Sequence, residues 1–507
     1  MEIELKLTLS PADAKKLGRH PVVAAATRSR PASRSLHSVY FDTPDRDLAR
    51  RGMALRVRQS RGRWVQTFKC GGGTNVGLHE REEFEAPTTA GHLNLPALLQ
   101  TPLAPLLADA TFLSRLAPAF TTEFRRQSRI VEIAPGETAE FAIDVGEIRA
   151  DDRSVPICEI EIELLTGVPR NVFAYARLLA EAFDVRLENA SKAERGYALM
   201  QDLPAMPVKA VAPTLAKDGT VTDAFRHLVG SCIFQLQANE RGVLESPDPE
   251  FVHQARVAIR RLRSAFALFR TVVPREAVAD PIGRFRELAA ALGDARDWDV
   301  FATETLPPIQ HVFAAEPSLV RLADVASGQR AAAQQIARNA LAARAYTTLL
   351  LDLAILLADA PWRAALDEEA RAIEALPVGE FAARVLRRQA KRARRLGRTV
   401  DRDNTAGLHA LRIEIKKLRY AVEFFSTLTS RKTVRRRLAG AAALQEILGH
   451  LNDATVTGHL LEGLTAGDPA LSFPAGIVRG WTGGRAEAGL DHFAEAWKRF
   501  ARIDYDD

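Results

Sequence analysis

Polar and apolar residues alternate along many short segments of the first 200 residues, and this alternation indicates β-strands with two unlike faces. The predicted strands are residues 2–9, 38–42, 53–59, 64–70, 82–86, 128–133, 140–145 and 156–165. Helical periodicity is rarer here and covers residues 10–18, 95–107 and 169–183. The pattern is typical of an α+β domain with a mostly antiparallel sheet that can close into a barrel.

The pattern changes near residue 203. Residues 204–219 contain three prolines and no periodic pattern, as expected for a linker. Beyond them the chain is rich in Ala, Leu and Arg, and its apolar positions repeat every 3.6 residues. Helices are predicted at residues 221–245, 250–270, 284–293, 330–358, 379–397, 406–428 and 433–448. We therefore predict a barrel-type domain at 1–203, a linker at 204–219 and an all-α domain at 220–507.

Composition excludes several classes of protein. With 507 residues, 47% of them apolar and 26% charged, the chain is not disordered throughout. The net charge of +6 is mild, so any polyanion must bind at local clusters. The three cysteines lie far apart without a CxxC pair, which argues against a disulfide framework or a zinc ribbon. The opening MEIELKL does not have the pattern of a secretory signal, and residues 346–361 are too short and too charged to span a membrane. We expect a cytoplasmic protein with no membrane partner.

Two segments of the helical half repeat one another at an offset of 156 residues. One reads HQARVAIRRLRSAFALF from His253, and the other reads HALRIEIKKLRYAVEFF from His409. Seven positions are identical and two more keep a cation, and the same offset relates Gly293 to Gly449. A constant offset predicts two copies of one helical unit with approximate symmetry.

Charged residues gather on one face of several predicted strands in the first half. They include the acidic set Glu2, Glu4, Glu159, Glu161 and Glu163 and the basic set Lys6, Arg56, Arg58, Lys69 and Arg81. A polar strand face is usually solvated, but rows of like charge repel unless opposite charges lie between them. If the sheet closes with these faces inward, the carboxylates suit Mg²⁺ or Mn²⁺ and the cations suit phosphate oxygens. A phosphate chain bridged by metal satisfies both sets.

These residues make the first 200 positions resemble the CYTH superfamily of triphosphate tunnel metalloenzymes. The family signature ExExK is met by the residues from Glu2 to Lys6. The segments VYFDTPDRDLARRGMALRVRQ, WVQTFK, GLHEREEFE, AIDVGEI, PICEIEIEL and SKAERGYALM follow in the family's order. The resemblance implies an antiparallel barrel that forms a tunnel, with metal-dependent hydrolysis or transfer at a triphosphate.

The resemblance also implies roles for individual residues. The metal-binding candidates are Glu2, Glu4, Asp144, Glu161 and Glu163, with Glu159 as the alternative register. The phosphate-binding candidates are Lys6, Arg56, Arg58, Arg81, Arg126 and Lys192, with Arg125 and Arg129 competing for the role of Arg126. Lys69 and Glu83 are the catalytic candidates. The implied chemistry is in-line attack of water on a terminal phosphorus, with the water activated by a metal-bound hydroxide, Lys69 or a glutamate.

The repeated helices carry basic stripes. His253, Arg256, Arg260 and Arg263 fall within about 80° on a helix, as do His409, Arg412, Lys416 and Arg419, with Arg261 and Lys417 on the flanks. Such a stripe is often simply exposed, but a cation row repels itself unless an anion neutralises it. The two helices resemble the CHAD domain, the conserved histidine α-helical domain. This resemblance implies two pseudo-symmetric four-helix bundles that bind inorganic polyphosphate. Residues 384–398, with eight Arg or Lys and no acid, are an auxiliary anion-site candidate.

From the sequence we predict an inorganic triphosphatase that hydrolyses tripolyphosphate, followed by a helical domain that binds long-chain polyphosphate and can place the protein on polyphosphate granules. One alternative is a non-catalytic polyphosphate-binding scaffold. Another is an organic-triphosphate enzyme, such as a nucleotide or thiamine triphosphatase or an adenylate cyclase. Nucleic acid is disfavoured because aromatic residues are only 7% and few lie in the basic stripes. One histidine per repeat without Cys or Asp at ligand spacing disfavours a transition-metal site.

Overall fold

The computed structural model describes residues 2–60, 62–201, 205–401 and 403–505. The predicted domain boundary at residues 203 and 204 lies outside them. The chain forms two compact units. The first comprises Met1–Met206 with Ala343–Ala360, and the second comprises Pro207–Ala342 with Pro361–Asp507.

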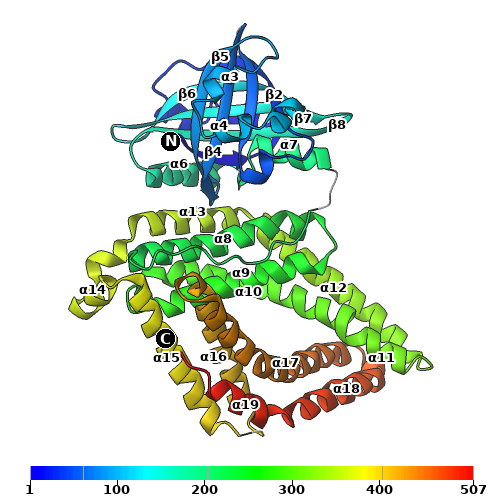
Figure 1. The fold of residues 1–507 in the computed structure, drawn as a ribbon. Coiled ribbons are helices and arrows are strands. Elements are labelled where there is room, and N and C mark those ends of the chain that lie inside the picture. The colour runs from blue at the N-terminus through cyan, green and yellow to red at the C-terminus, as the bar shows by residue number, and fades with distance from the viewer. Residues whose placement is uncertain (1, 61, 202–204, 402, 506–507) are drawn as a thin grey trace. The chain divides into compact units, whose positions relative to one another are not determined.

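Eight antiparallel strands close into a barrel in the first unit (Figure 1). The strand order is β5-β4-β3-β2-β6-β7-β8-β1, and pairing of β1 with β5 closes it. The strands are β1 (Glu2–Thr8), β2 (Ala32–Asp42), β3 (Ala54–Ser60), β4 (Arg63–Asn75), β5 (Leu78–Thr88), β6 (Ala117–Ala134), β7 (Glu137–Ala150) and β8 (Arg153–Thr166), and a short β9 (Arg186–Leu187) adds to β1. The predicted antiparallel barrel is confirmed, and closure leaves its eight strands without a free sheet edge.

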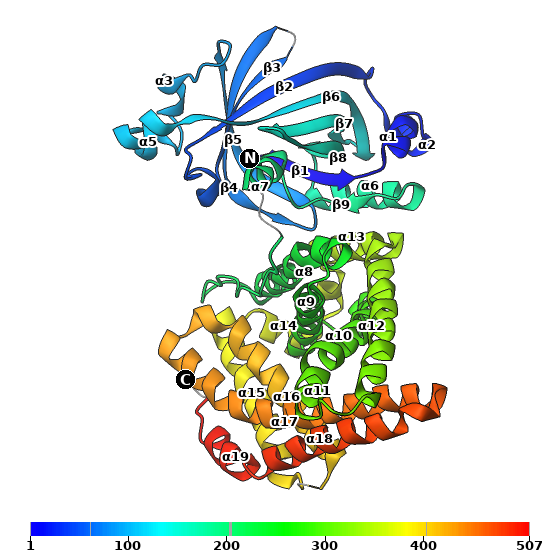
Figure 2. The same ribbon diagram turned by 90° about the vertical axis from the view of Figure 1, so that its right-hand side faces the viewer.

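Helices cover the outer face of the barrel, and this explains why the charged strand faces turn inward. Leu55 and Val57 of β3 are fully buried in a cluster with residues of the short helices α3 (Leu95–Leu98), α4 (Ala104–Leu107) and α5 (Ala110–Arg115). Because side chains alternate along a strand, Arg56 and Arg58 then point into the lumen. Figure 2 shows α3 and α5 at one end of the barrel and α1 (Pro11–Leu17) and α2 (Pro21–Ala26) at the other.

The helix α6 (Pro169–Ala182) packs against β1, β6 and β8, and α13 (Arg344–Asp359) packs against α6. Arg177 Nε donates to Asp352 Oδ1 over 2.8 Å, and Thr347 Oγ1 donates to the carbonyl of Val185 over 3.0 Å. The first compact unit therefore includes a helix from within the predicted all-α segment 220–507. The prediction of one helix over 330–358 is wrong, because Ala343 has an extended backbone (φ −67°, ψ 142°) that separates α12 (Ser318–Ala342) from α13.

The second unit is helical, as predicted. Its helices are α8 (Val221–Glu245), α9 (Pro249–Leu268), α10 (Ala279–Val300), α11 (Leu306–Val312), α12, α14 (Glu368–Glu374), α15 (Val378–Thr399), α16 (Thr405–Phe424), α17 (Arg431–Gly467), α18 (Ser472–Leu490) and α19 (Phe493–Ala501). In the first copy, α8, α9, α10 and α12 pack in a ring, and in the second, α15, α16, α17 and α18 pack in succession. Of the described helices, no single one is long and apolar enough to cross a membrane, and only α12 with α13, bent by 50°, passes that test as a pair.

The internal repeat is visible in the helix boundaries. The helices α9 and α16 have 20 residues each, and both of their bounds are displaced by 156 positions. Phe269 and Phe425, the residues that follow the two helices, have ring centroids 6.2 Å apart. In the second copy the 37-residue α17 takes the place of α10, a π-helical turn at Phe301–Thr305 and α11.

Candidate functional site

Charged side chains of both signs fill the lumen of the barrel. The cavity between them measures about 70 Å³ and is lined by Glu2, Glu4, Lys6, Tyr40, Ala54, Arg56, Arg58, Thr67, Lys69, His79, Arg81, Arg126, Glu161, Ser191, Lys192 and Ala193. Of the eight barrel strands, all except β7 contribute at least one charged or polar side chain to this lining, and β8 contributes Glu161. The lumen is narrow because oppositely charged side chains meet across it.

The densest part of this network surrounds Glu161. Lys6 Nζ lies 2.5 Å from Glu161 and 2.7 Å from Glu4. Arg126 donates to Asp144 through Nε (2.8 Å) and Nη2 (2.7 Å), and it also contacts Glu161. Burial alone would raise the pKa of Glu161, but the cationic charges of Lys192, Lys6 and Arg126 outweigh burial and hold it well below its usual value.

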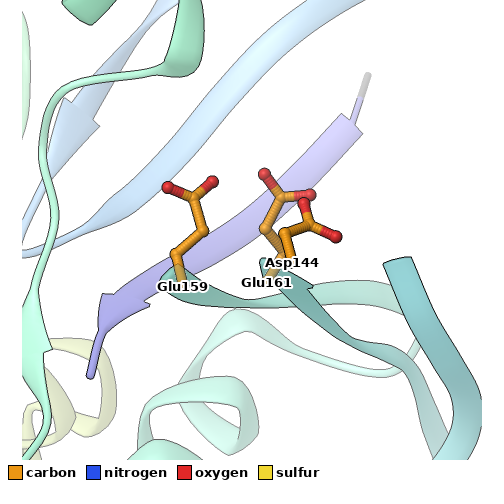
Figure 3. Close-up of side chains that lie close together, drawn as sticks. All are labelled: Asp144, Glu159 and Glu161. Atoms are coloured by element: carbon orange, nitrogen blue, oxygen red, sulfur yellow. The ribbon is translucent and has the colours of Figure 1, made fainter. Parts of the chain in front are cut away.

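Lys192, at the start of α7 (Lys192–Gln201), closes the same network from outside the sheet. Its Nζ donates to Asp144 over 2.7 Å and to Glu161 over 2.8 Å, and it also contacts Glu159. Figure 3 shows these three carboxylates together on β7 and β8, and one oxygen of each lies within 4.8 Å of one oxygen of the others. Burial alone would lower the pKa of Lys192, but the negative charges of the three carboxylates outweigh burial and raise the pKa above its ordinary value.

The two catalytic candidates meet elsewhere in the lumen. Lys69 Nζ lies 3.3 Å from Glu83 Oε2 and also contacts Glu2. Arg56 reaches the other oxygen of Glu83 over 3.6 Å. Arg81 pairs with Glu194 of α7 over 3.1 Å. The structure thus places Lys69 and Glu83 in one chain of ion pairs with a metal-binding candidate.

Glu163 is the carboxylate of the predicted metal set that remains without a cation. It lies directly opposite Glu4 in the β1–β8 register, where two like charges repel. Burial, together with the charges of Glu2, Glu4 and Glu140, raises the pKa of Glu163 to about 7. No ion pair of Glu163 occurs among the described residues. A divalent cation bound beside Glu2, Glu4 and Glu163 would remove this repulsion. Among the described residues, the three acidic side chains whose oxygens converge most closely are instead Asp144, Glu159 and Glu161, which Lys192 holds.

Arg58 is the opposite case, a lumen cation without an acidic partner. Its Nε donates to Ser38 Oγ over 3.0 Å, and its guanidinium lies 5.7 Å from the ring centroid of Phe124. Burial and the neighbouring charges of Arg56 and Arg126 lower the pKa of Arg58 to about 9. Within the described part of the chain no carboxylate lies within 4.0 Å of it. An anionic ligand would supply the missing charge.

Tyr40, His79 and Arg195 are among the residues in or beside the lumen that were not predicted. Tyr40 lies opposite Arg56 in the β2–β3 register, and although burial raises its pKa, Arg56 and Arg58 outweigh this and lower it. His79 has its pKa lowered to about 4 by burial and by Lys6. Arg195 donates to Glu159 over 2.7 Å. The only sequence signal for Arg195 was its position one helical turn after Lys192.

In the second unit, the repeated helices line a cleft of about 930 Å³. From α9 it receives His253, Arg256, Arg260 and Arg261, and from α16 it receives Arg412, Lys416 and Arg419. Within the described residues, Arg260, Arg412 and Lys416 have no carboxylate within 4.0 Å. Burial and the charges of Arg260 and Arg412 lower the pKa of Lys416 to about 7. Arg260, Arg412 and Lys416 thus line the cleft without a carboxylate in contact, although Asp453 lies near enough to counteract part of the lowering of the pKa of Lys416 and Arg412.

Other predicted cations of the helical unit have different surroundings. Arg261 is only 3% exposed, pairs with Glu423 over 2.7 Å and lies 4.7 Å from the ring centroid of Phe424. Lys417 pairs with Glu414 over 2.7 Å, and it does not line the cleft. Arg263 and His409 are exposed and also lie outside the lining. The basic cluster at 384–398 lies on α15, where most of its cations are exposed.

Comparison with known proteins agrees with this division. Residues 1–197 match the CYTH domain family and residues 227–462 match the CHAD domain family. An inorganic triphosphatase of Haemophilus influenzae is 35% identical over 205 residues, which cover 39% of this chain and 54% of that protein, so the chain spans about half the length of this relative. An uncharacterized protein of Mycobacterium tuberculosis is 27% identical over 481 residues, or 88% of this chain and 86% of that protein.

Among solved structures, the CHAD domain from the plant Ricinus communis is similar to the helical part, with 33% identity and a TM-score of 0.51. The match covers 58% of this chain and 97% of the plant domain. Both the motifs and the folded units are therefore accounted for by two known families. The chain belongs to the proteins that carry a CYTH domain followed by a CHAD domain.

Proposed function

We propose that the barrel hydrolyses inorganic triphosphate with a divalent metal, Mg²⁺ or Mn²⁺. The observation that carries the proposal is the closed lumen in which rows of Glu and of Arg and Lys face each other. The similarity of this domain to an inorganic triphosphatase supports the same reaction. A linear triphosphate with bound metal presents both charges that these rows need.

The lumen cations act on the phosphate oxygens. Arg58 has no acidic partner to lose, so it binds an entering phosphate without breaking an ion pair. Arg126, Lys6 and Lys192 are paired with carboxylates, chiefly Asp144 and Glu161, and an entering phosphate would compete with these carboxylates for the three cations. Their positive charges neutralise the charge that develops on the equatorial oxygens during in-line attack of water. A bound divalent cation, held by Glu2, Glu4 and Glu163, would supply further charge neutralisation at the phosphates.

A phosphate-release assay on the full chain tests this proposal. With Mg²⁺ or Mn²⁺, we expect kcat/KM for tripolyphosphate to exceed that for ATP or thiamine triphosphate by about tenfold or more, because the lumen lining is charged and offers little apolar surface to an organic group. Absence of phosphate release from tripolyphosphate would contradict the proposal in favour of a non-catalytic scaffold. Faster turnover of ATP would contradict it in favour of an organic-triphosphate enzyme.

We also propose that the cleft between α9 and α16 binds inorganic polyphosphate. Arg260, Arg412 and Lys416 come from both copies of the repeat and lack acidic partners in the described structure. A polyphosphate chain offers one negative charge per phosphate and can bridge all three cations. This binding would allow the protein to associate with polyphosphate granules.

The lowered pKa of Lys416 predicts that polyphosphate affinity depends on pH. With a pKa of about 7, Lys416 is mostly protonated at pH 6 and mostly neutral at pH 8 in the free protein. Its neighbours Arg256, Arg260 and Arg412 stay charged over this range, Asp453 opposes them, and the pKa of His253 is lowered. We expect affinity to fall by up to about tenfold from pH 6 to pH 8, as the protonated fraction of Lys416 falls.

Fluorescence anisotropy with labelled polyphosphate measures this effect. A Lys416→Arg variant, which keeps its charge, should show a flatter profile at high affinity. A Lys416→Met variant should show a flat profile at low affinity. An equally steep profile in either variant would assign the titration to another group, with His253 the next to test.

A further inference from the structure

The strands β6 and β7 carry charged residues on both faces. Arg126 and Asp144 are paired in register and face the lumen. The alternate residues Arg125, Gln127 and Arg129 of β6 and Ile143 and Val145 of β7 therefore face outward. Together with α1 and Pro31 they enclose a second cavity of about 440 Å³ (Figure 2 shows α1 beside these strands).

The innermost polar group of this outer cavity is Arg129. The residue is 9% exposed, and its Nη1 donates to the carbonyl of Gly18 over 2.7 Å. Its Nε is buried without a hydrogen-bond partner. No carboxylate of the described chain lies within 4.0 Å of the guanidinium. A buried cation without an anion is costly, and a bound anion would compensate for it.

Three more cations line the outer cavity. Lys15, in the last turn of α1, and Arg19, two residues after its end, are both exposed. Arg125 donates through Nε to Ser33 Oγ over 2.9 Å. None of the three forms an ion pair within the described residues, and the lining contains no Asp or Glu. All charged side chains that line the outer cavity are therefore cations, a composition that favours an anionic ligand.

Apart from Gly18 and the polar Gln127, the rest of the lining is apolar. It consists of Pro11, Ala14, Pro31, Ile143 and Val145. Val145 is 43% exposed, which is unusual for a large aliphatic residue next to a cluster of cations. A purely inorganic anion would leave this surface in contact with water, whereas a ligand with a ring or aliphatic part would cover it.

We propose that the outer cavity is a binding site for a small organic phosphate. The phosphate group binds between Arg129, Lys15 and Arg19, and the apolar part of the ligand packs on Val145 and Pro31. The sheet separates this site from the lumen, because neighbouring residues on β6 and β7 face opposite sides. The proposal does not depend on the activity proposed for the lumen.

Methyl NMR of the full chain tests the proposal through the δ1 methyl of Ile143, which lines the outer cavity. AMP and pyrophosphate are the probes. We expect AMP to shift this methyl resonance saturably with a Kd below about 1 mM, and pyrophosphate to bind more weakly despite its higher charge. The double variant Lys15→Glu/Arg19→Glu should weaken AMP binding by about tenfold or more, since two cations become anions.

The matched control is Lys16→Glu/Arg63→Glu, which changes the net charge equally at two exposed positions outside the cavity. It should bind AMP like the wild type. Absence of a saturable AMP shift would overturn the proposal. An equal shift in the Lys15→Glu/Arg19→Glu variant would also overturn it, because the signal would then arise from the lumen, and pyrophosphate binding tighter than AMP would exclude an organic ligand.

Discussion

Replacing Arg58 with methionine is expected to lower kcat/KM for tripolyphosphate by about 10²–10³ without lowering the thermal stability of the protein. Arg58 faces the lumen with Ser38 as its hydrogen-bond partner and no carboxylate among the described residues. Its burial next to Arg56 and Arg126 is unfavourable in the free protein, as its pKa of about 9 reflects. The variant therefore loses a contact to the substrate while it removes a repulsion from the folded state.

Two comparisons make this result specific. Arg126→Met removes a cation that pairs with Asp144 and Glu161, and it should lower the free energy of unfolding by about 3–5 kcal/mol. Arg63→Met changes an exposed arginine on β4 and should alter neither property. Activity would be measured by phosphate release and stability by thermal unfolding. An Arg58→Met variant with wild-type kcat/KM would remove Arg58 from the substrate site.

The barrel was predictable because alternation is a property of consecutive residues. The rows around Glu161 and Arg58 carry like charges that need opposite charges nearby, and inward closure of the sheet supplies them. All eight predicted strands exist, although β6 runs over Ala117–Ala134 where only 128–133 was predicted. The missing part of β6 contains Thr121, Thr122 and Glu123, whose polar side chains hide the alternation.

The choice between Arg125, Arg126 and Arg129 needed the register of β6. Sequence shows three cations within five positions, but only the pairing of Arg126 with Asp144 identifies the lumen face. The break at Ala343 was equally invisible, since the segment LAARAY contains neither glycine nor proline. Long-range packing of α13 on α6 explains this position better than any local preference of its residues.

In the repeated helices, too, the sequence could not show which charged residues are paired in the folded protein. The repeat identified the cations of α9 and α16, but it did not show which of them are paired. Arg256 and Arg261 pair with acids distant in sequence, whereas Lys417 pairs with Glu414 only three residues away. Arg261 lies next to Arg260, yet it is buried against Phe424 and paired with Glu423. Two adjacent arginines of one motif therefore differ in role: Arg261 is part of the packed structure, whereas Arg260 is available to a ligand.

This difference leads to a charge-matched prediction for polyphosphate binding. The double variant Arg260→Ala/Lys416→Ala should bind long-chain polyphosphate about 100-fold more weakly, because each charged hydrogen bond to phosphate contributes about 1.5 kcal/mol or more. The double variant Arg263→Ala/Lys417→Ala also removes two motif cations, but neither of them lines the cleft, and its affinity should stay near that of the wild type.

Gel retardation or anisotropy would compare the polyphosphate affinities of the two variants. Both measurements need the same ionic strength, because salt weakens the binding of any polyanion to cations. Equal losses in the two double variants would mean that polyphosphate responds to the general positive field of the helices. A loss confined to Arg260→Ala/Lys416→Ala would locate binding in the cleft, where the two halves of the repeat each contribute a cation with no described carboxylate within 4.0 Å.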